Sequence, residues 1–344
     1  MTLIIVLKCG RITVNVDFLK WISLTLDISE GLALSEKMED YTGFMKNASS
    51  KDFLVTKDDR ESQPESFVIM NCVLNTLLMF ICILGNALVL AAITRTPSIR
   101  SPSMAMLCSL AVSDFFVGFI AQPLFIADEL ITENLVLYRV SAMIGFSVCG
   151  VSLATITLIS VDRLLAVQYH LRYATLVRQS RVIHMIVMIW LFTFVCSGFH
   201  IWNKFLYHLL SAIYIAICLI ISTFCYIRIY LTVRHHRSQI QAQQQAVQCR
   251  YAVNNTSMMR LKRSAVNTFL FYICMIVCYF PAYVLLTIFG LGYMEWAREW
   301  AIAPTVVFMN SSINPILYCW RLRELRGAVI KTMKRVQCAQ SDQD

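Results

Sequence analysis

Several polar side chains lie inside long apolar stretches of this sequence, where burial is costly unless polar groups share a site. An aspartate at the centre of a bilayer costs roughly 2.5–3.5 kcal/mol on insertion scales, so it normally faces a polar interior. Asp114 is the charged residue of the apolar stretch 103–127. Its candidate partners at comparable depth are Asn86, Ser152, Asn310, Ser311 and Asn314. Two interpretations stay open: a hydrogen-bonded packing cluster, or a small hydrated cavity whose cation or proton occupancy changes when helices shift.

A second charged feature ends the stretch 140–161, whose 22 residues carry no charge. At about 1.5 Å per residue this stretch crosses a bilayer core of about 30 Å. It finishes on the adjacent pair Asp162 and Arg163, and small residues recur along it. Because small residues let membrane helices approach closely, the stretch predicts a central helix that ends in an ion pair at one membrane face.

The composition is that of a membrane protein. Of the 344 residues, 58% are hydrophobic and 15% are charged, and the mean hydropathy is +0.62. Soluble domains are nearer half apolar and a quarter charged. The net charge of +9 does not indicate nucleic-acid binding, because the basic residues gather in alternate loops between apolar spans. The cysteines lie mostly inside apolar runs and lack the spacing of a zinc site.

Seven apolar stretches are long enough to cross a bilayer as helices, and none alternates like a barrel strand. They are residues 67–93, 103–127, 140–161, 182–202, 205–227, 264–294 and 300–320. The sequence therefore predicts an all-α membrane protein, a seven-transmembrane-helix bundle over residues 67–320. A short amphipathic eighth helix on the membrane surface is predicted over 321–336. Residues 1–66 are predicted to be a disordered extracellular tail, and residues 337–344 a cytosolic tail.

Basic loops set the predicted orientation. Because they follow the first, third, fifth and seventh spans, the positive-inside rule places the N-terminus outside and the C-terminus in the cytosol. Asn47 lies in a glycosylation sequon of the outer tail, and Cys338, just beyond the amphipathic helix, is a palmitoylation candidate. An ordinary tail cysteine is an equal alternative for Cys338. Translation could also begin at Met38.

One short motif falls on each span. The motifs are Gly85-Asn86-x-x-Val89, Leu110-Ala111-Val112-Ser113-Asp114, Asp162-Arg163-Leu164, Trp190, Tyr226, Pro281 in Cys-Tyr-Phe-Pro, and Asn314-Pro315-Ile-Leu-Tyr318. In this order and register, they resemble those of the rhodopsin-like (class A) G-protein-coupled receptors across residues 67–336. The loops after spans three and seven are similar to those of the melanocortin and adenosine receptors. The short fourth-to-fifth connection and the absence of proline in span five are similar to the melanocortin receptors.

The resemblance implies roles for individual residues. Asp114, with Asn86, Ser152, Asn310, Ser311 and Asn314, matches the family's allosteric sodium (Na⁺) pocket. Arg163 matches the arginine held by its neighbouring acid, here Asp162, at rest and freed to meet the G protein. The other implied switch residues are Tyr226, Tyr279, Pro281, Pro315 and Tyr318. Leu261 replaces an acid that often faces the arginine, which predicts a weak resting lock and appreciable basal signalling.

The ligand pocket departs from well-known members of the family. Gly145 stands where amine receptors have an aspartate, and Phe308 stands where opsins have a lysine and adenosine receptors a histidine. The pocket candidates are Phe125, Asp128, Gly145, Phe146, Tyr207, Tyr279, Tyr283 and Phe308. Such a lining suits a small neutral or lipid-like ligand, with a peptide also open. Asp128 could meet a cationic ligand, although a solvated helix end is the favoured interpretation.

Two function classes remain. The first is a plasma-membrane receptor, not an enzyme, with an extracellular ligand and a heterotrimeric G protein as partners, together with arrestin and receptor kinases. The alternative is a seven-helix transporter or proton-coupled carrier that uses Asp114. Carriers usually show repeat symmetry and broken helices in both halves, and neither is visible in this sequence.

Overall fold

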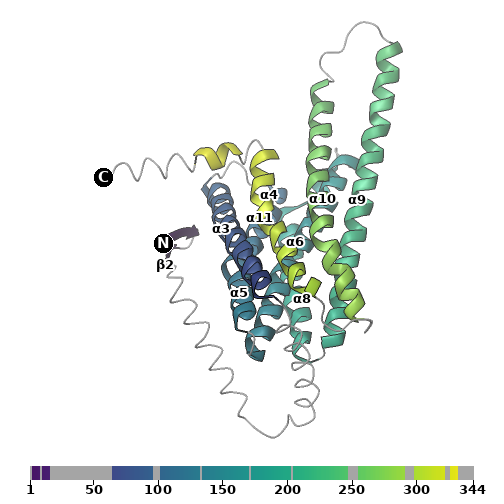
Figure 1. Cartoon of the computed structure of the whole chain (residues 1–344). Helices are drawn as coiled ribbons and strands as arrows, with labels where there is room; N and C mark the ends of the chain where they lie inside the picture. Colours follow the sequence, from purple (N-terminus) through teal and green to yellow (C-terminus); the bar gives the residue numbers. More distant parts are fainter. Residues whose placement is uncertain are drawn as a thin grey trace.

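A bundle of long helices forms the body of the computed structural model (Figure 1). The structure describes residues 2–7, 10–15, 64–95, 101–131, 134–169, 172–202, 204–246, 255–290, 298–321 and 326–331. The glycosylation candidate Asn47 and the palmitoylation candidate Cys338 lie outside these residues, as does Met38. The predicted helical membrane bundle is confirmed.

The seven predicted spans appear as helices whose ends extend past the apolar stretches or stop short of them. They are α3 (Glu65–Arg95), the composite α4 (Pro102–Phe116), η2 (Val117–Ala121) and α5 (Gln122–Leu130), α6 (Leu135–Gln168), α8 (Gln179–Trp202), α9 (Lys204–Ala246), α10 (Asn255–Gly290) and α11 (Arg298–Arg321). Within the described residues, the first five spans are long and apolar enough to cross a membrane, and α10 contains the shorter apolar segment Tyr272–Ile288. In Figure 1, α9 and α10 rise well beyond the other helices at one end.

Helix α6 lies at the centre, as its small residues predicted. It contacts α4, α8 and α9, while α3 lies between α4 and α11. Glycines bring backbones close: a Cβ on Gly85 would stand 2.9 Å from Pro315, and one on Gly150 would stand 3.3 Å from Thr193. These contacts link α3 to α11 and α6 to α8, and they follow the small-residue packing expected of membrane helices.

The second span contains a π-helical turn that the sequence analysis did not predict. The turn covers Val117–Ala121, and Pro123 follows two residues later, at the start of α5. A proline has no N–H to donate and its ring crowds the carbonyl four residues earlier, so the backbone widens there. The turn sets the rotation of α5, which carries Gln122, Phe125 and Asp128 inward, where all three are buried.

The two ends of the chain add smaller elements. Strands β1 (Thr2–Leu7) and β2 (Gly10–Asn15) pair antiparallel inside the tail that was predicted to be disordered. Both strands are rich in β-branched residues, which favour extended strands. Residues 326–331 are helical and lie across the end of α11 in Figure 1. Ala328 and Val329 are buried there, whereas Arg326 and Lys331 are exposed, which is the amphipathic arrangement predicted for the eighth helix.

Candidate functional site

Asp114 lies at the centre of a polar cluster inside the bundle. The residue is fully buried, and its carboxylate accepts hydrogen bonds from the hydroxyl of Ser152 and the amide of Asn314, each at 2.8 Å. Ser311 also lies beside this carboxylate. The predicted partners from the third and seventh spans are therefore brought together around Asp114.

The neighbouring amides are less completely satisfied. Asn86 donates to the carbonyls of Cys82 and Ser311, at 2.9 and 3.2 Å, and so joins α3 to α11. Its amide oxygen has no hydrogen-bond partner among the described residues, nor has either amide atom of the buried Asn310. Buried polar atoms normally find a partner, which can be water or an ion. The buried amide oxygens of Asn86 and Asn310 thus have unused capacity to bind a water molecule or an ion.

The Asp162–Arg163 pair is formed near the C-terminal end of α6. Arg163 donates to the Asp162 carboxylate at 2.8 Å, and the Asp162 side chain is only 1% exposed. Sequence reasoning missed two further donors to this carboxylate, Tyr173 at 2.6 Å and Ser103 at 2.9 Å. Burial and the bond to Asp162 raise the pKa of the Tyr173 hydroxyl, so it remains a donor at physiological pH. Asp162 is therefore fixed by three groups.

The predicted switch tyrosines and prolines lie on α9, α10 and α11. Tyr226 is 3.3 Å from the Ser160 hydroxyl and its ring lies against Tyr272, with centroids 4.5 Å apart. Tyr318 is almost fully buried in the main core. Pro281 lies inside α10, and Pro315 lies inside α11. The side chain of Leu261 lies outside the described residues, so the predicted weak lock remains a prediction.

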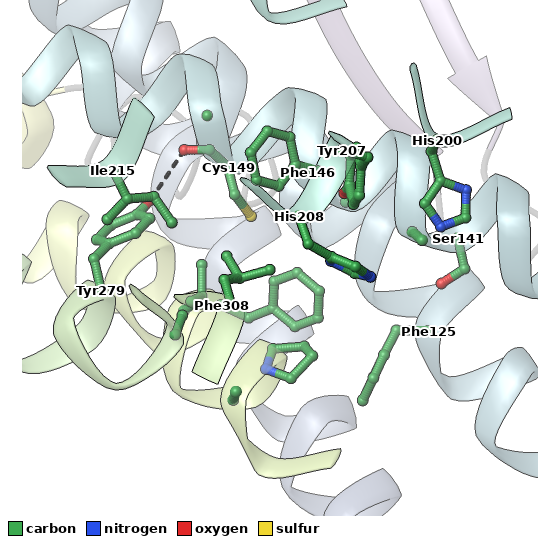
Figure 2. A pocket seen from close by; sticks show the side chains of 18 of the residues that line it. Phe125, Ser141, Phe146, Cys149, His200, Tyr207, His208, Ile215, Tyr279 and Phe308 are labelled. Carbon is green, nitrogen blue, oxygen red and sulfur yellow. Dashed lines mark hydrogen bonds between the residues drawn. The ribbon is translucent and has the colours of Figure 1, made fainter. Parts of the chain in front are cut away.

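A central cavity of about 160 Å³ opens at the bundle end opposite the ion pair. It runs from Tyr279 and Ile215 toward His200, with Phe146 and Tyr207 packed together along one wall (Figure 2). Seven of the eight predicted pocket residues line it: Phe125, Asp128, Gly145, Phe146, Tyr207, Tyr279 and Phe308. Tyr283 does not line the cavity. The favoured interpretation of Asp128 as a solvated helix end is wrong, because the residue is 4% exposed and borders this cavity.

Polar residues at the cavity end were only partly anticipated. Glu129, Tyr138, Ser141, His200 and His208 line this end in addition to Asp128. His200 and His208 flank the very short connection at position 203 between α8 and α9. These two histidines, close to the helix ends on either side of the short turn, could have indicated a polar cavity end from the sequence. The cavity therefore combines an apolar body with acids and imidazoles at one end.

Tyr279 connects the cavity to the helix that carries the ion pair. Its hydroxyl donates to the main-chain carbonyl of Cys149 at 3.0 Å, and Figure 2 shows this bond between α10 and α6. Tyr279 and Cys149 both line the cavity. A ligand that displaced the tyrosine would therefore break a contact between the two helices.

A second buried polar network joins α3, α5 and α11, and sequence reasoning missed it. The amide of Asn75 donates to Thr305 at 2.8 Å, and Thr305 donates to Asn71 at 2.7 Å. Gln122 reaches the carbonyl of Asn75 at 3.5 Å. The rule that identified Asp114, a polar side chain inside an apolar span, could have found these residues.

Comparison with known proteins gives an independent test. A model of the family described as 7 transmembrane receptor (rhodopsin family) matches residues 85–204. The alpha-1A adrenergic receptor of Oryctolagus cuniculus is 22% identical over 329 residues, which cover 80% of this chain and 70% of the relative. Melanocortin receptor 5 of Homo sapiens is 28% identical over 283 residues, which cover 75% of this chain and 81% of the relative. Adenosine receptor A2b of Gallus gallus is 23% identical over 327 residues, covering 78% and 90%.

Proposed function

We propose that this chain, which belongs to the rhodopsin family of G-protein-coupled receptors, passes a signal across the membrane in two steps. An extracellular ligand enters the central cavity, and the ligand-bound bundle activates a heterotrimeric G protein at the opposite face. The observation that carries this proposal is the continuity of α6, which lines the cavity at Gly145 and Cys149 and ends in the Asp162–Arg163 pair. The ligand and the G protein then bias one equilibrium between two helix arrangements. A carrier that uses Asp114 is not favoured, and family membership implies a non-enzymatic receptor.

The cavity lining supports a ligand class. Its walls are mainly aromatic and aliphatic, and its polar residues gather at one end around Asp128 and His200. A pocket of this kind holds a mostly apolar molecule and orients it by a few polar contacts. We therefore propose a small or lipid-like ligand with one polar end, which lies toward Asp128.

Filling the cavity should separate ligand response from basal activity. Among the described residues, a Cβ on Gly145 would meet only Phe308, at 4.0 Å, so the glycine faces open space inside the cavity. Gly145→Phe is expected to remove the response of transfected cells to active lipid-extract fractions while ligand-free nucleotide exchange persists. Gly145→Ala adds one methyl group at ordinary contact distance and serves as the control, with its response retained. An unchanged response in Gly145→Phe would place the ligand elsewhere.

Removing a donor from Asp162 should lower basal signalling. Tyr173→Phe removes the shortest hydrogen bond to the Asp162 carboxylate, together with a 3.3 Å contact to the Ser103 hydroxyl. When Arg163 leaves, the carboxylate then keeps Ser103 but not Tyr173 as a donor. Because a hydrogen bond to a charged group contributes about 1.5–3 kcal/mol, release of Arg163 becomes harder, and ligand-free nucleotide exchange is expected to fall about tenfold or more. Tyr169→Phe is the matched control, since Tyr169 is 48% exposed in the same region. Equal exchange rates in the two variants would show that the Tyr173 hydroxyl does not support Asp162 when Arg163 is released.

We also propose that a sodium ion binds at Asp114. The Asp114 carboxylate and the buried amide oxygens of Asn86 and Asn310, which have no hydrogen-bond partner among the described residues, are oxygen donors, the ligand type that hard cations prefer. Bound there, the ion would supply a positive charge beside the buried carboxylate. The hydroxyl of Ser152 and the amide of Asn314 hold the carboxylate in place.

The receptor is a multi-pass plasma-membrane protein, and we propose that its N-terminus is extracellular and its C-terminus cytosolic. The basic loops support this orientation. It would expose Asn47 to glycosylation and Cys338 to palmitoylation, and would present the cytosolic face to arrestin and receptor kinases. Epitope tags on both ends of the chain test this orientation. In intact cells, without permeabilisation, antibody should reach the N-terminal tag alone. Staining of both tags, or of the C-terminal tag alone, would refute the orientation.

A further inference from the structure

A second, smaller cavity lies on the outside of the bundle between α8 and α9. We call it the side groove; it has a volume of about 120 Å³, and its lining includes Phe146, Phe192, Thr193, Ser211, Tyr214 and Ile217. Phe192 and Ile217 are 55% and 51% exposed at its mouth. Both helices are long and apolar enough to cross a membrane, so the groove opens to the bilayer rather than to water.

A thin partition separates the side groove from the central cavity. Phe146 and Tyr214 line both spaces. The hydroxyl of Tyr214 donates to the carbonyl of Gly150 at 3.0 Å, and Gly150 faces the central cavity. A Cβ on Gly150 would stand 3.3 Å from Thr193 in the groove. Two aromatic side chains and one stretch of glycine backbone therefore make up the wall.

The chemistry of the groove favours hydrocarbon. Among the residues that the structure describes, none that lines the groove is charged. Its hydroxyls already donate to main-chain carbonyls: Thr193 to that of Ile189 at 2.9 Å, Ser211 to that of Tyr207 at 2.6 Å, and Tyr214 to that of Gly150. A ligand in this groove would find only apolar contact, which an acyl chain provides and a water-soluble amine or peptide does not.

We propose that the side groove is a lateral entrance, through which the hydrocarbon chain of a single-chain lipid passes from the bilayer into the central cavity. Phe146 and Tyr214 form the gate. The ring centroids of Phe146 and Tyr207 are 5.2 Å apart, and those of Tyr214 and Phe192 are 6.0 Å apart. Opening requires rotation of these side chains and loss of the one hydrogen bond to Gly150. The inference rests on the proposed function, because it presumes an apolar ligand in the central cavity.

Photolabelling in lipid nanodiscs tests the entrance. The probe is a palmitoyl monoglyceride with a diazirine near the end of its chain, and labelled peptides are located by mass spectrometry. The full-length receptor should be labelled both in the groove and on central-cavity residues such as Phe308. Ile217→Trp, which blocks the mouth, should reduce central-cavity labelling several-fold. Ile220→Trp is the control, because Ile220 lies on the same helix, is 67% exposed and does not line the groove.

Each alternative outcome has a distinct meaning. Central-cavity labelling that survives Ile217→Trp would overturn the proposed lateral entrance. The proposal that an apolar ligand binds in the central cavity would still stand. Labelling confined to the groove, or spread evenly over the lipid-facing surface of α8 and α9, would also overturn it. The receptor function itself is read separately, from nucleotide exchange in the Gly145→Phe and wild-type chains, so failure of one proposal does not imply failure of the other.

Discussion

Replacing Arg163 with alanine is expected to lower G-protein nucleotide exchange by about ten- to a hundredfold. In the proposed mechanism the guanidinium leaves Asp162 and donates to the G protein. Hydrogen bonds from a charged group contribute about 1.5–3 kcal/mol, and each 1.4 kcal/mol is a factor of ten. The measurement is GTP-analogue binding by purified G protein on membranes with equal amounts of receptor at the surface. The same loss is expected with and without an activating ligand.

The fold should survive this substitution. Breaking a fully buried ion pair costs about 3–5 kcal/mol, but the Arg163 side chain is 31% exposed and Asp162 keeps Tyr173 and Ser103 as donors. Surface expression and melting temperature should therefore stay close to wild type. Arg181→Ala is the control, because Arg181 is exposed and donates a hydrogen bond to the main-chain carbonyl of Leu176, away from Asp162. Normal exchange in Arg163→Ala at equal expression would remove the guanidinium from the mechanism.

The spans could be predicted because the length of an apolar run is a local property. Each of the seven apolar stretches contains or overlaps a helix, and α6 is central as its small residues indicated. The helix ends were less accurate, since α9 continues to Ala246 and α10 begins at Asn255, in polar sequence. Hydropathy cannot detect a helix that leaves the membrane, because its polar faces are solvated there.

The Asp114 cluster could be predicted for a different reason. Its members stand out individually as polar residues in hydrocarbon, and such residues must meet inside the bundle. The hydrogen bonds to Ser152 and Asn314 confirm that they meet. The Tyr173–Asp162 bond could not be found in this way, because both residues are near the membrane edge, where a polar side chain needs no partner. Only the path of the loop brings the hydroxyl to the carboxylate.

The buried position of Asp128 shows how one local irregularity alters a site. An uninterrupted α-helix through the second span would present a different face at this depth. The π-helical turn at Val117–Ala121 adds rotation before Gln122, and Asp128 is then carried into the cavity wall. Pro123 was the visible signal, but proline alone does not specify whether a helix kinks or widens. The acidic end of the cavity could therefore be located only from the structure.

Replacing Asp114 should abolish a sodium response and, with an apolar residue, destabilise the receptor. In the proposed site, sodium at ten times its dissociation constant would stabilise the wild-type receptor by about 1.4 kcal/mol. Its melting temperature should therefore be higher in sodium chloride than in choline chloride at equal ionic strength. Asp114→Asn keeps an oxygen that can accept from Ser152 or Asn314 but loses the charge, so its melting temperature should not depend on the cation.

Asp114→Leu removes the acceptor as well as the charge, and this distinguishes packing from ion binding. The buried donors of Ser152 and Asn314 then lose their partner, at a cost of about 1–3 kcal/mol for each donor left unsatisfied. Asp114→Leu is therefore expected to melt below Asp114→Asn in both salts. If Asp114→Asn kept the wild-type sodium shift, the ion would bind elsewhere. If the wild type showed no shift while Asp114→Leu still melted lower, the cluster would act as a hydrogen-bonded joint between α4, α6 and α11 without a cation.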